Sequence, residues 1–242
     1  MLLLLTWAAG SVDAISYLGL GHVFTAMMTG NIVLLGLSLA ELDLLAALRS
    51  LLAVLGFSVG VFVGAMIVER ESKIAEWPGV VNAALVVEAV ALATFTTTWL
   101  LVGATPGAGA RYFLIILLAF AMGIQSAAVR RLGVPGIATT YITGTLTSLM
   151  VDLLGWLRSL AAPLPVSNST DGGSAERSRP IPWEQRVALL ASVVGLYCFG
   201  ALAGGIVVAR WPALASFLPL SALTLVVVNA VLRYRYRFRS RF

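Results

Sequence analysis

The sequence has little charge, one cysteine and one histidine. Only 11% of its 242 residues are charged, whereas 60% are hydrophobic and the mean hydropathy is +0.96. So few polar groups cannot cover a water-soluble globule, which excludes the soluble classes. The lone Cys198 excludes a disulfide framework, and its apolar segment favours a small packing role. Because no second His or Cys accompanies His22, we expect neither a metal cluster nor a cofactor.

The apolar segments predict an all-α polytopic membrane protein. Several segments exceed the roughly 18 residues that a hydrocarbon core of about 30 Å requires of a helix. Strict alternation of apolar and polar residues is absent, so helices are favoured over a barrel. Charges, Gly and Pro delimit eight segments, some of them short enough to be broken or re-entrant, so that six to eight would span the bilayer. They lie at about 2–20, 25–40, 43–69, 79–103, 111–132, 138–159, 184–209 and 213–232.

Two of these segments begin at an interruption rich in Gly and Thr. The first, AISYLGLGHVFTAMMTGN, covers residues 14–31, and the second, AVRRLGVPGIATTYITGT, covers residues 128–145. Aligned at their first residues, they pair Ala14 with Ala128, Leu18 with Leu132, Gly19 with Gly133, Thr25 with Thr139, Thr29 with Thr143 and Gly30 with Gly144. We therefore predict an internal duplication.

A second register, with a larger offset, extends the duplication. It pairs Gly60 with Gly200, Gly64 with Gly204 and Arg70 with Arg210, and a Trp-Pro pair recurs at Trp77 and Trp211. The predicted halves are residues 1–104 and 105–242 of one integral membrane domain. The second half carries a polar loop at about 161–183, rich in Pro, Ser and Gly, and a basic-aromatic tail at 233–242.

The same two regions carry a resemblance to a known family. The stretches AGSVDAISYLGLGHVFTAMMTGNIVLLG and AMGIQSAAVRRLGVPGIATTYITGTLTS are similar to the signature regions of the YoaK-type family of bacterial inner-membrane proteins. That resemblance implies a multi-helix membrane protein and no established activity. Met27 and Ser126 stand where the family pattern has Asn, so a contact that those amides make in relatives would be altered here.

Two topologies are compatible with the sequence. Eight spans with the C-terminus inside give eleven Lys and Arg inside (Arg49, Arg111, Arg158, Arg177, Arg179, Arg186 and the five arginines of the tail) and five outside (Arg70, Lys73, Arg130, Arg131 and Arg210). This bias predicts a cytoplasmic C-terminus in a bacterial inner membrane. In the alternative, each short first pair is one broken element, which leaves three elements per half and inverts the second half.

Paired interruptions in corresponding halves are a pointer to a transporter binding site. A broken helix frees backbone groups, and hydroxyls or amides at the break would suit a small polar solute. The alternative is that Thr and Gly only pack helices together. The candidate solute contacts are Thr25, Thr29, Gly30, Asn31, Gln125, Thr139, Thr140, Thr143, Gly144 and Thr145.

Two acidic residues lie near the middle of apolar segments. A charge at the bilayer centre costs at least about 2.5–3.5 kcal/mol on insertion scales, so Asp13 and Glu88 are candidates for proton coupling. The alternative is a structural carboxyl, for Asp13 one that Ser16 or Tyr17 would cap. Asp152 lies nearer a segment end and is expected at the interface.

These features favour a small-solute secondary transporter or exporter, with proton coupling as a candidate mechanism. The alternatives are a non-transporting scaffold and an intramembrane enzyme, but the sequence has no GxSxG or HExxH motif, so we predict no enzyme. The expected partners are the lipid bilayer, a small polar solute, anionic lipid at the arginine-aromatic tail, and a second copy packed through the face of Gly60 and Gly64. Nucleic acid is not expected, because the tail directly follows a membrane segment.

Overall fold

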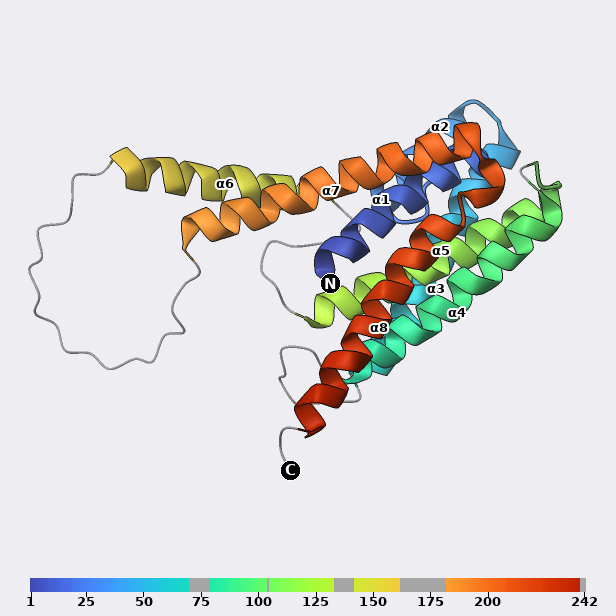
Figure 1. Cartoon of the computed structure of the whole chain (residues 1–242). Coiled ribbons are helices and arrows are strands. Elements are labelled where there is room, and N and C mark those ends of the chain that lie inside the picture. Colours follow the sequence, from blue (N-terminus) through green and yellow to red (C-terminus); the bar gives the residue numbers. More distant parts are fainter. Residues whose placement is uncertain (70–78, 104, 133–141, 162–181, 240–242) are drawn as a thin grey trace, which may run out of the picture.

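The computed structural model describes residues 1–69, 79–103, 105–132, 142–161 and 182–239, which are helical apart from short turns (Figure 1). All eight predicted segments are confirmed as helices. They are α1 (Leu2–Gly19), α2 (Met28–Ala40), α3 (Leu44–Val68), α4 (Gly79–Val102), α5 (Ala108–Arg131), α6 (Ile142–Ala161), α7 (Trp183–Arg210) and α8 (Phe217–Arg239), with the short 3-10 helix η1 (Pro212–Leu214) before α8.

Six of the helical segments in the described part of the chain are long and apolar enough to cross a membrane. They are α1, α3, α4, α5, α7 and the segment Pro212–Ala230, which joins η1 to α8. Large apolar side chains cover their outer faces; for example, Phe62, Val90 and Leu101 are 67%, 62% and 82% exposed. Such a surface fits a bilayer and not water. Helix α2, with 13 residues, is about 20 Å long and too short to span by itself.

Helices α1 and α7 run parallel and pack through glycines. A methyl group added at Gly200 would overlap the carbonyl oxygen of Trp7, and one added at Gly204 would lie 2.7 Å from the carbonyl oxygen of Ser11. Gly204 follows Gly200 by four residues, and its contact Ser11 follows Trp7 by four residues. The two helices therefore point the same way. Glycine is required here, since any side chain would push the backbones apart.

Helices α3 and α5 form a second parallel pair of the same kind. A methyl group at Gly56 would lie 2.8 Å from the carbonyl oxygen of Ile116, and one at Gly60 would overlap the carbonyl oxygen of Phe120. The glycines of α3 therefore pack inside the chain. This corrects the prediction of a second copy docked on Gly60 and Gly64, because α5 already occupies that face.

Helix α4 packs against α3, α5 and α8 and fixes the end of the bundle where α8 begins. The Trp99 indole N–H donates to the carbonyl oxygen of Pro212 at 2.9 Å, and the Thr96 hydroxyl donates to the carbonyl oxygen of Ser216 at 3.1 Å. Gly19 lies against Trp99, where a methyl group would be 2.5 Å from the ring. These contacts join α1, α4 and the turn before α8.

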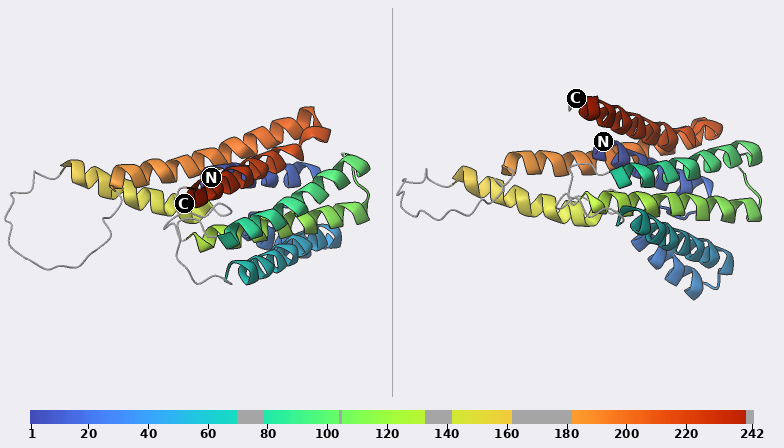
Figure 2. Two further views of the ribbon diagram at one scale, coloured as in Figure 1. Left: turned by 60° about the horizontal axis from the view of Figure 1, so that its bottom comes forward. Right: turned by 90° about the horizontal axis from the view of Figure 1, so that it is seen from below.

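Helix α6 and the first turns of α7 extend away from the other helices as an antiparallel arm (Figures 1 and 2). Arg186 of α7 forms an ion pair of 3.1 Å with Asp152 of α6, and its guanidinium lies 5.8 Å from the Trp183 ring centroid. Asp152 therefore joins α6 to α7, and its expected place at the membrane interface stays a prediction. The predicted polar loop between these helices falls on residues 162–181, outside the described residues.

One smaller expectation was wrong, because Cys198 is exposed on the surface of α7 and is not buried in helix packing. Helix α8 continues without a break into the predicted basic-aromatic tail, as far as Arg239.

Candidate functional site

The interruption between α1 and α2 is held by one carboxylate. Oδ1 of Asp13 accepts the backbone N–H groups of Thr25, Ala26 and Met27 at 2.9, 2.7 and 3.3 Å. These groups directly precede α2, and the side chain of its N-cap residue, Met27, makes no capping hydrogen bond. An acid close to a helix N-terminus satisfies free N–H groups and complements the helix dipole. Asp13, from within α1, thus caps the turn that leads into α2.

This capping places the start of α2 deep in the bundle. Asp13 lies six residues before the end of α1 at Gly19, which is about 9 Å along the helix axis. The chain therefore leaves α1, turns back alongside it and starts α2 at the level of Asp13. Helix α2 then ends at an exposed turn, where Asp43 caps α3 by accepting the Ala46 N–H at 3.0 Å. This is the geometry of a re-entrant segment.

Asn31 holds the same turn from the other side. Its Oδ1 accepts the Phe24 N–H at 2.9 Å, and its Nδ2 donates to the Phe24 carbonyl oxygen at 2.6 Å. Nδ2 also lies 3.6 Å from the Met28 sulfur. The amide is fully buried, and these contacts use both its carbonyl and its N–H₂. Asn31 therefore acts on the backbone of the break.

Aromatic rings close the outer part of the turn. Tyr17 stacks on Phe24 with ring centroids 5.0 Å apart and meets His22 edge-on at 4.9 Å. His22 has a φ of +60°, next to Gly21 at +95°, so the chain reverses through two left-handed residues. The Arg49 side chain lies against Gly21, where a methyl group would be 3.1 Å from Cδ. His22 thus packs against Tyr17 within the turn.

At the break, the Thr25 side chain stands out because its hydroxyl takes part in no hydrogen bond with the described residues. The residue is fully buried. A buried hydroxyl without a partner costs about 1–3 kcal/mol. Thr29, by contrast, is exposed, and Gly30 makes room for Phe24, since a methyl group there would lie 3.0 Å from that ring.

The second interruption is described only from its end. Thr139 and Thr140 lie outside the described residues, whereas Thr143, Gly144 and Thr145 form the first turn of α6. Thr145 is buried and Thr143 and Gly144 are exposed. Whether the two interruptions meet around a solute therefore stays a prediction.

Gln125 and Glu88 lie deeper in the bundle. Gln125 of α5 is buried and donates through Nε2 to the carbonyl oxygen of Leu5 in α1 at 3.2 Å. Glu88 of α4 is fully buried, and neither carboxyl oxygen has a hydrogen-bond partner among the described residues. The two predicted proton-coupling acids thus occupy very different surroundings.

Tyr197 is the site residue that sequence reasoning missed. Its hydroxyl donates to Oδ2 of Asp13 at 2.5 Å, and its carbonyl oxygen faces Gly10 across the α1–α7 contact. The expected caps of Asp13, Ser16 and Tyr17, do not fill this role, because the Ser16 hydroxyl donates to the Asp13 backbone carbonyl instead. The second register of the duplication pairs Tyr197 with Phe57 and could have drawn attention to it.

Comparisons with known proteins agree with this architecture. The family described as "Protein of unknown function (DUF1275)" matches residues 1–230. The chain is 43% identical over 157 residues to UPF0700 transmembrane protein YoaK of Bacillus subtilis (strain 168), which covers 65% of this chain and 68% of that protein. No solved structure matches the chain. The chain therefore belongs to the DUF1275 family, and it is similar to the transmembrane protein YoaK.

Proposed function

We propose that the protein is a small-solute secondary transporter or exporter whose solute site lies at the α1–α2 break. The supporting observation is the re-entrant start of α2, whose backbone reaches the level of Asp13 and brings the buried, unpartnered Thr25 hydroxyl with it. Non-helical backbone at membrane depth is tolerated where protein or a hydrated cavity surrounds it. Discontinuous helices of this kind form the binding sites of many secondary transporters.

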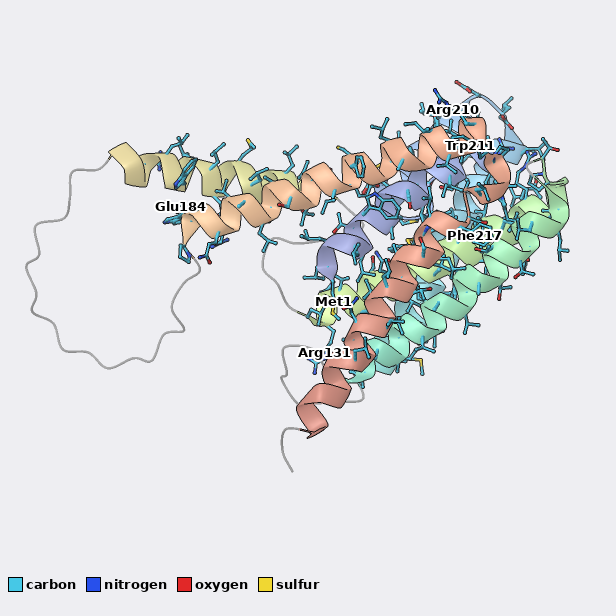
Figure 3. The ribbon with its side chains drawn as sticks, in the orientation of Figure 1. Met1, Arg131, Glu184, Arg210, Trp211 and Phe217 are labelled. Carbon is cyan, nitrogen blue, oxygen red and sulfur yellow. The ribbon has the colours of Figure 1, made fainter. Side chains whose placement is uncertain are left out.

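The proposal includes two inverted halves of three spans each. In the α1–α7 pair, Gly200 contacts Trp7 and Gly204 contacts Ser11. In the α3–α5 pair, Gly60 contacts Phe120 and Gly64 contacts Ile124 in the same way. These matching contacts relate α1 to α5 and α3 to α7. Met1 and Arg131 lie toward one end and Arg210 and Phe217 toward the other (Figure 3), so α1 and its counterpart α5 run in opposite directions.

Charge supports an orientation with both ends of the chain in the cytoplasm of a bacterial cell. Of the described residues, eight arginines lie toward the end that bears Met1 or on the α6–α7 arm, and three lie toward the opposite end. The first group is Arg130, Arg131, Arg158, Arg186, Arg233, Arg235, Arg237 and Arg239, and the second is Arg49, Arg111 and Arg210. This bias follows the positive-inside rule for an inner-membrane protein. The arginines at the end of α8 would also contact anionic lipid headgroups.

A matched pair of variants tests the solute site. Thr25→Val removes the unpartnered hydroxyl at nearly constant volume, and Thr97→Val removes an exposed hydroxyl of α4 that donates to the Ala93 carbonyl at 2.9 Å. Untargeted metabolite profiling compares cells that lack the protein with cells that contain the wild type or either variant. We expect at least one small polar solute to differ with the wild type and Thr97→Val, and the difference to shrink with Thr25→Val.

Two outcomes would count against transport. Profiles that do not change with the wild-type protein, followed by proteoliposomes that move none of a broad metabolite panel, would favour a non-transporting scaffold. Equal profiles for Thr25→Val and Thr97→Val, at equal protein levels, would remove Thr25 from the solute site.

A further inference from the structure

The two buried acids of the membrane interior differ in their partners. Asp13 accepts three backbone N–H groups and the Tyr197 hydroxyl. Glu88 is also fully buried, yet neither of its oxygens has a hydrogen bond or an ion pair among the described residues. A carboxylate can be stable only where donors or positive charge replace the water it has lost. Asp13 has those donors and Glu88 does not.

Glu88 also lies on the apolar face of α4. It is the tenth of the helix's 24 residues, between Leu85 and Leu92, with Phe95 one turn further, and all three of these side chains are buried. The face continues through Val81 to Trp99 without another acid or base. The position is therefore the middle of a membrane-spanning helix, on the side turned toward protein.

In the described parts of the neighbouring helices, no Lys or Arg occupies a position at this level. Helix α4 packs against α3, α5 and α8, whose titratable residues lie within two turns of the helix ends, and it meets α1, whose titratable residues are Asp13 and Tyr17, at Gly19. Those near the helix ends are Arg49 in α3, Arg111, Tyr112, Arg130 and Arg131 in α5, and Arg233, Tyr234, Arg235, Tyr236, Arg237 and Arg239 in α8. A charged Glu88 would therefore be unpaired in the interior, which is among the most costly arrangements in a protein.

We propose that Glu88 is the proton-binding carboxyl of the membrane interior, and that Asp13 is a permanent structural anion. In the conformation described, Glu88 carries its proton as a neutral acid. It releases that proton when a rearrangement of α4 against α5 or α8 brings water to the carboxyl group. As the coupling site of a transporter, this assignment rests on the function proposed above and names the proton as the coupling ion.

A proton fits this position better than a metal ion does. Hard cations require about six oxygen ligands, several of them usually carboxylates. Within the described residues, no group of three His, Cys, Asp or Glu side chains comes together. A single neutral carboxyl in apolar surroundings is a site for one proton only.

Infrared spectroscopy of the purified protein in lipid tests the assignment directly. A protonated carboxylic acid has a carbonyl stretching band that a carboxylate and an amide lack, and the band shifts in deuterated water. We expect this band in the wild type and in Asp13→Asn, and its loss in Glu88→Gln, which is nearly isosteric. A wild type without the band, or a band that disappears with Asp13→Asn and persists in Glu88→Gln, would overturn the assignment.

A second measurement needs no variant and so does not depend on folding. A hydrophobic carbodiimide reacts with protonated carboxyl groups within membranes, and peptide mass analysis of the labelled wild type locates the adduct. Label on Glu88 and none on Asp13 is expected, whereas label on Asp13 alone would reverse the two roles. Neither measurement involves a solute, so a failure of transport and a failure of this assignment can be told apart.

Discussion

The hydrogen bonds of Asp13 make a quantitative prediction about the stability of the break. Asp13→Ala removes the acceptor of three backbone N–H groups, at 2.9, 2.7 and 3.3 Å, and of the Tyr197 hydroxyl at 2.5 Å. Tyr197→Phe removes only the last of these bonds and keeps the ring. The two variants therefore separate the capping of α2 from the tie between α1 and α7.

The expected costs follow from the number of partners lost. A buried polar group left without a partner costs about 1–3 kcal/mol, and a hydrogen bond to a charged group contributes about 1.5–3 kcal/mol. Water can reach part of the opened turn, so we expect Asp13→Ala to lower the free energy of unfolding by about 3–5 kcal/mol and Tyr197→Phe by about 2 kcal/mol. In the double variant, the tyrosine should matter little, because its acceptor is already gone.

Reversible unfolding of the purified protein in detergent, with denaturing detergent as the titrant, measures these differences. The sum of the two single effects should exceed the effect of the double variant by about 1–2 kcal/mol. Tyr197→Phe combined with Thr97→Val, whose hydroxyl bonds within α4, serves as the control and should be additive. Additive effects of Asp13→Ala and Tyr197→Phe, or a cost of Asp13→Ala below about 1 kcal/mol, would refute the proposed capping role.

Three further predictions concern packing and topology. Gly200→Ala, which meets the Trp7 backbone, should destabilise the protein by about 1–3 kcal/mol, whereas Gly195→Ala in the same helix, with nothing within 4 Å, should be neutral or slightly stabilising in the same unfolding assay. Trp99→Phe should lower the free energy of unfolding by about 1 kcal/mol more than the smaller side-chain volume explains, because the hydrogen bond to the Pro212 carbonyl oxygen is lost. An unchanged free energy of unfolding would contradict this. In a Cys198→Ser background, a membrane-impermeant thiol reagent should label a cysteine at Glu41 in intact spheroplasts and one at Glu184 only after the membrane is opened; labelling of both in intact spheroplasts would exclude the proposed orientation.

The lengths and positions of the helices could be predicted from the sequence because they follow from one-dimensional patterns. Apart from the end of α8, apolar runs, Gly and Pro place the bounds of all eight helices within about four residues of those observed. The sequence predicts the start of α2 at 25 and it lies at Met28, because the backbone of Thr25 to Met27 forms the turn that Asp13 binds. The end of α8 was placed at 232 and lies at Arg239, because alternating Arg and aromatic residues do not interrupt a helix.

The partners of the site residues could not be predicted in the same way. The Asp13–Tyr197 bond joins residues 184 positions apart, and only the packing of α1 on α7 brings them together. Likewise, the sequence identified Gly60 and Gly64 as a packing face but not the helix that fills it, since small residues every four positions fit any close neighbour. The sequence marks the polar residues of the apolar segments only as a group, and the contacts are needed to separate those with hydrogen-bond partners from those without one among the described residues.

The two proposed halves are alike in backbone contacts and different in chemistry. Tyr197 faces Gly10 through its carbonyl oxygen, as Phe57 faces Gly123 in the α3–α5 pair, but Phe57 has no hydroxyl to donate. In the register that pairs Gly10 with Gly123, the counterpart of Asp13 is Ser126, which carries no charge. The first break is therefore tied to α7 through a carboxyl group, whereas the corresponding position of the second half has a hydroxyl group. Any movement of α1 against α7 must strain or release the bond between Asp13 and Tyr197, and through Asp13 it acts on the N-terminus of α2. A rearrangement of the first break is thus linked to one helix contact.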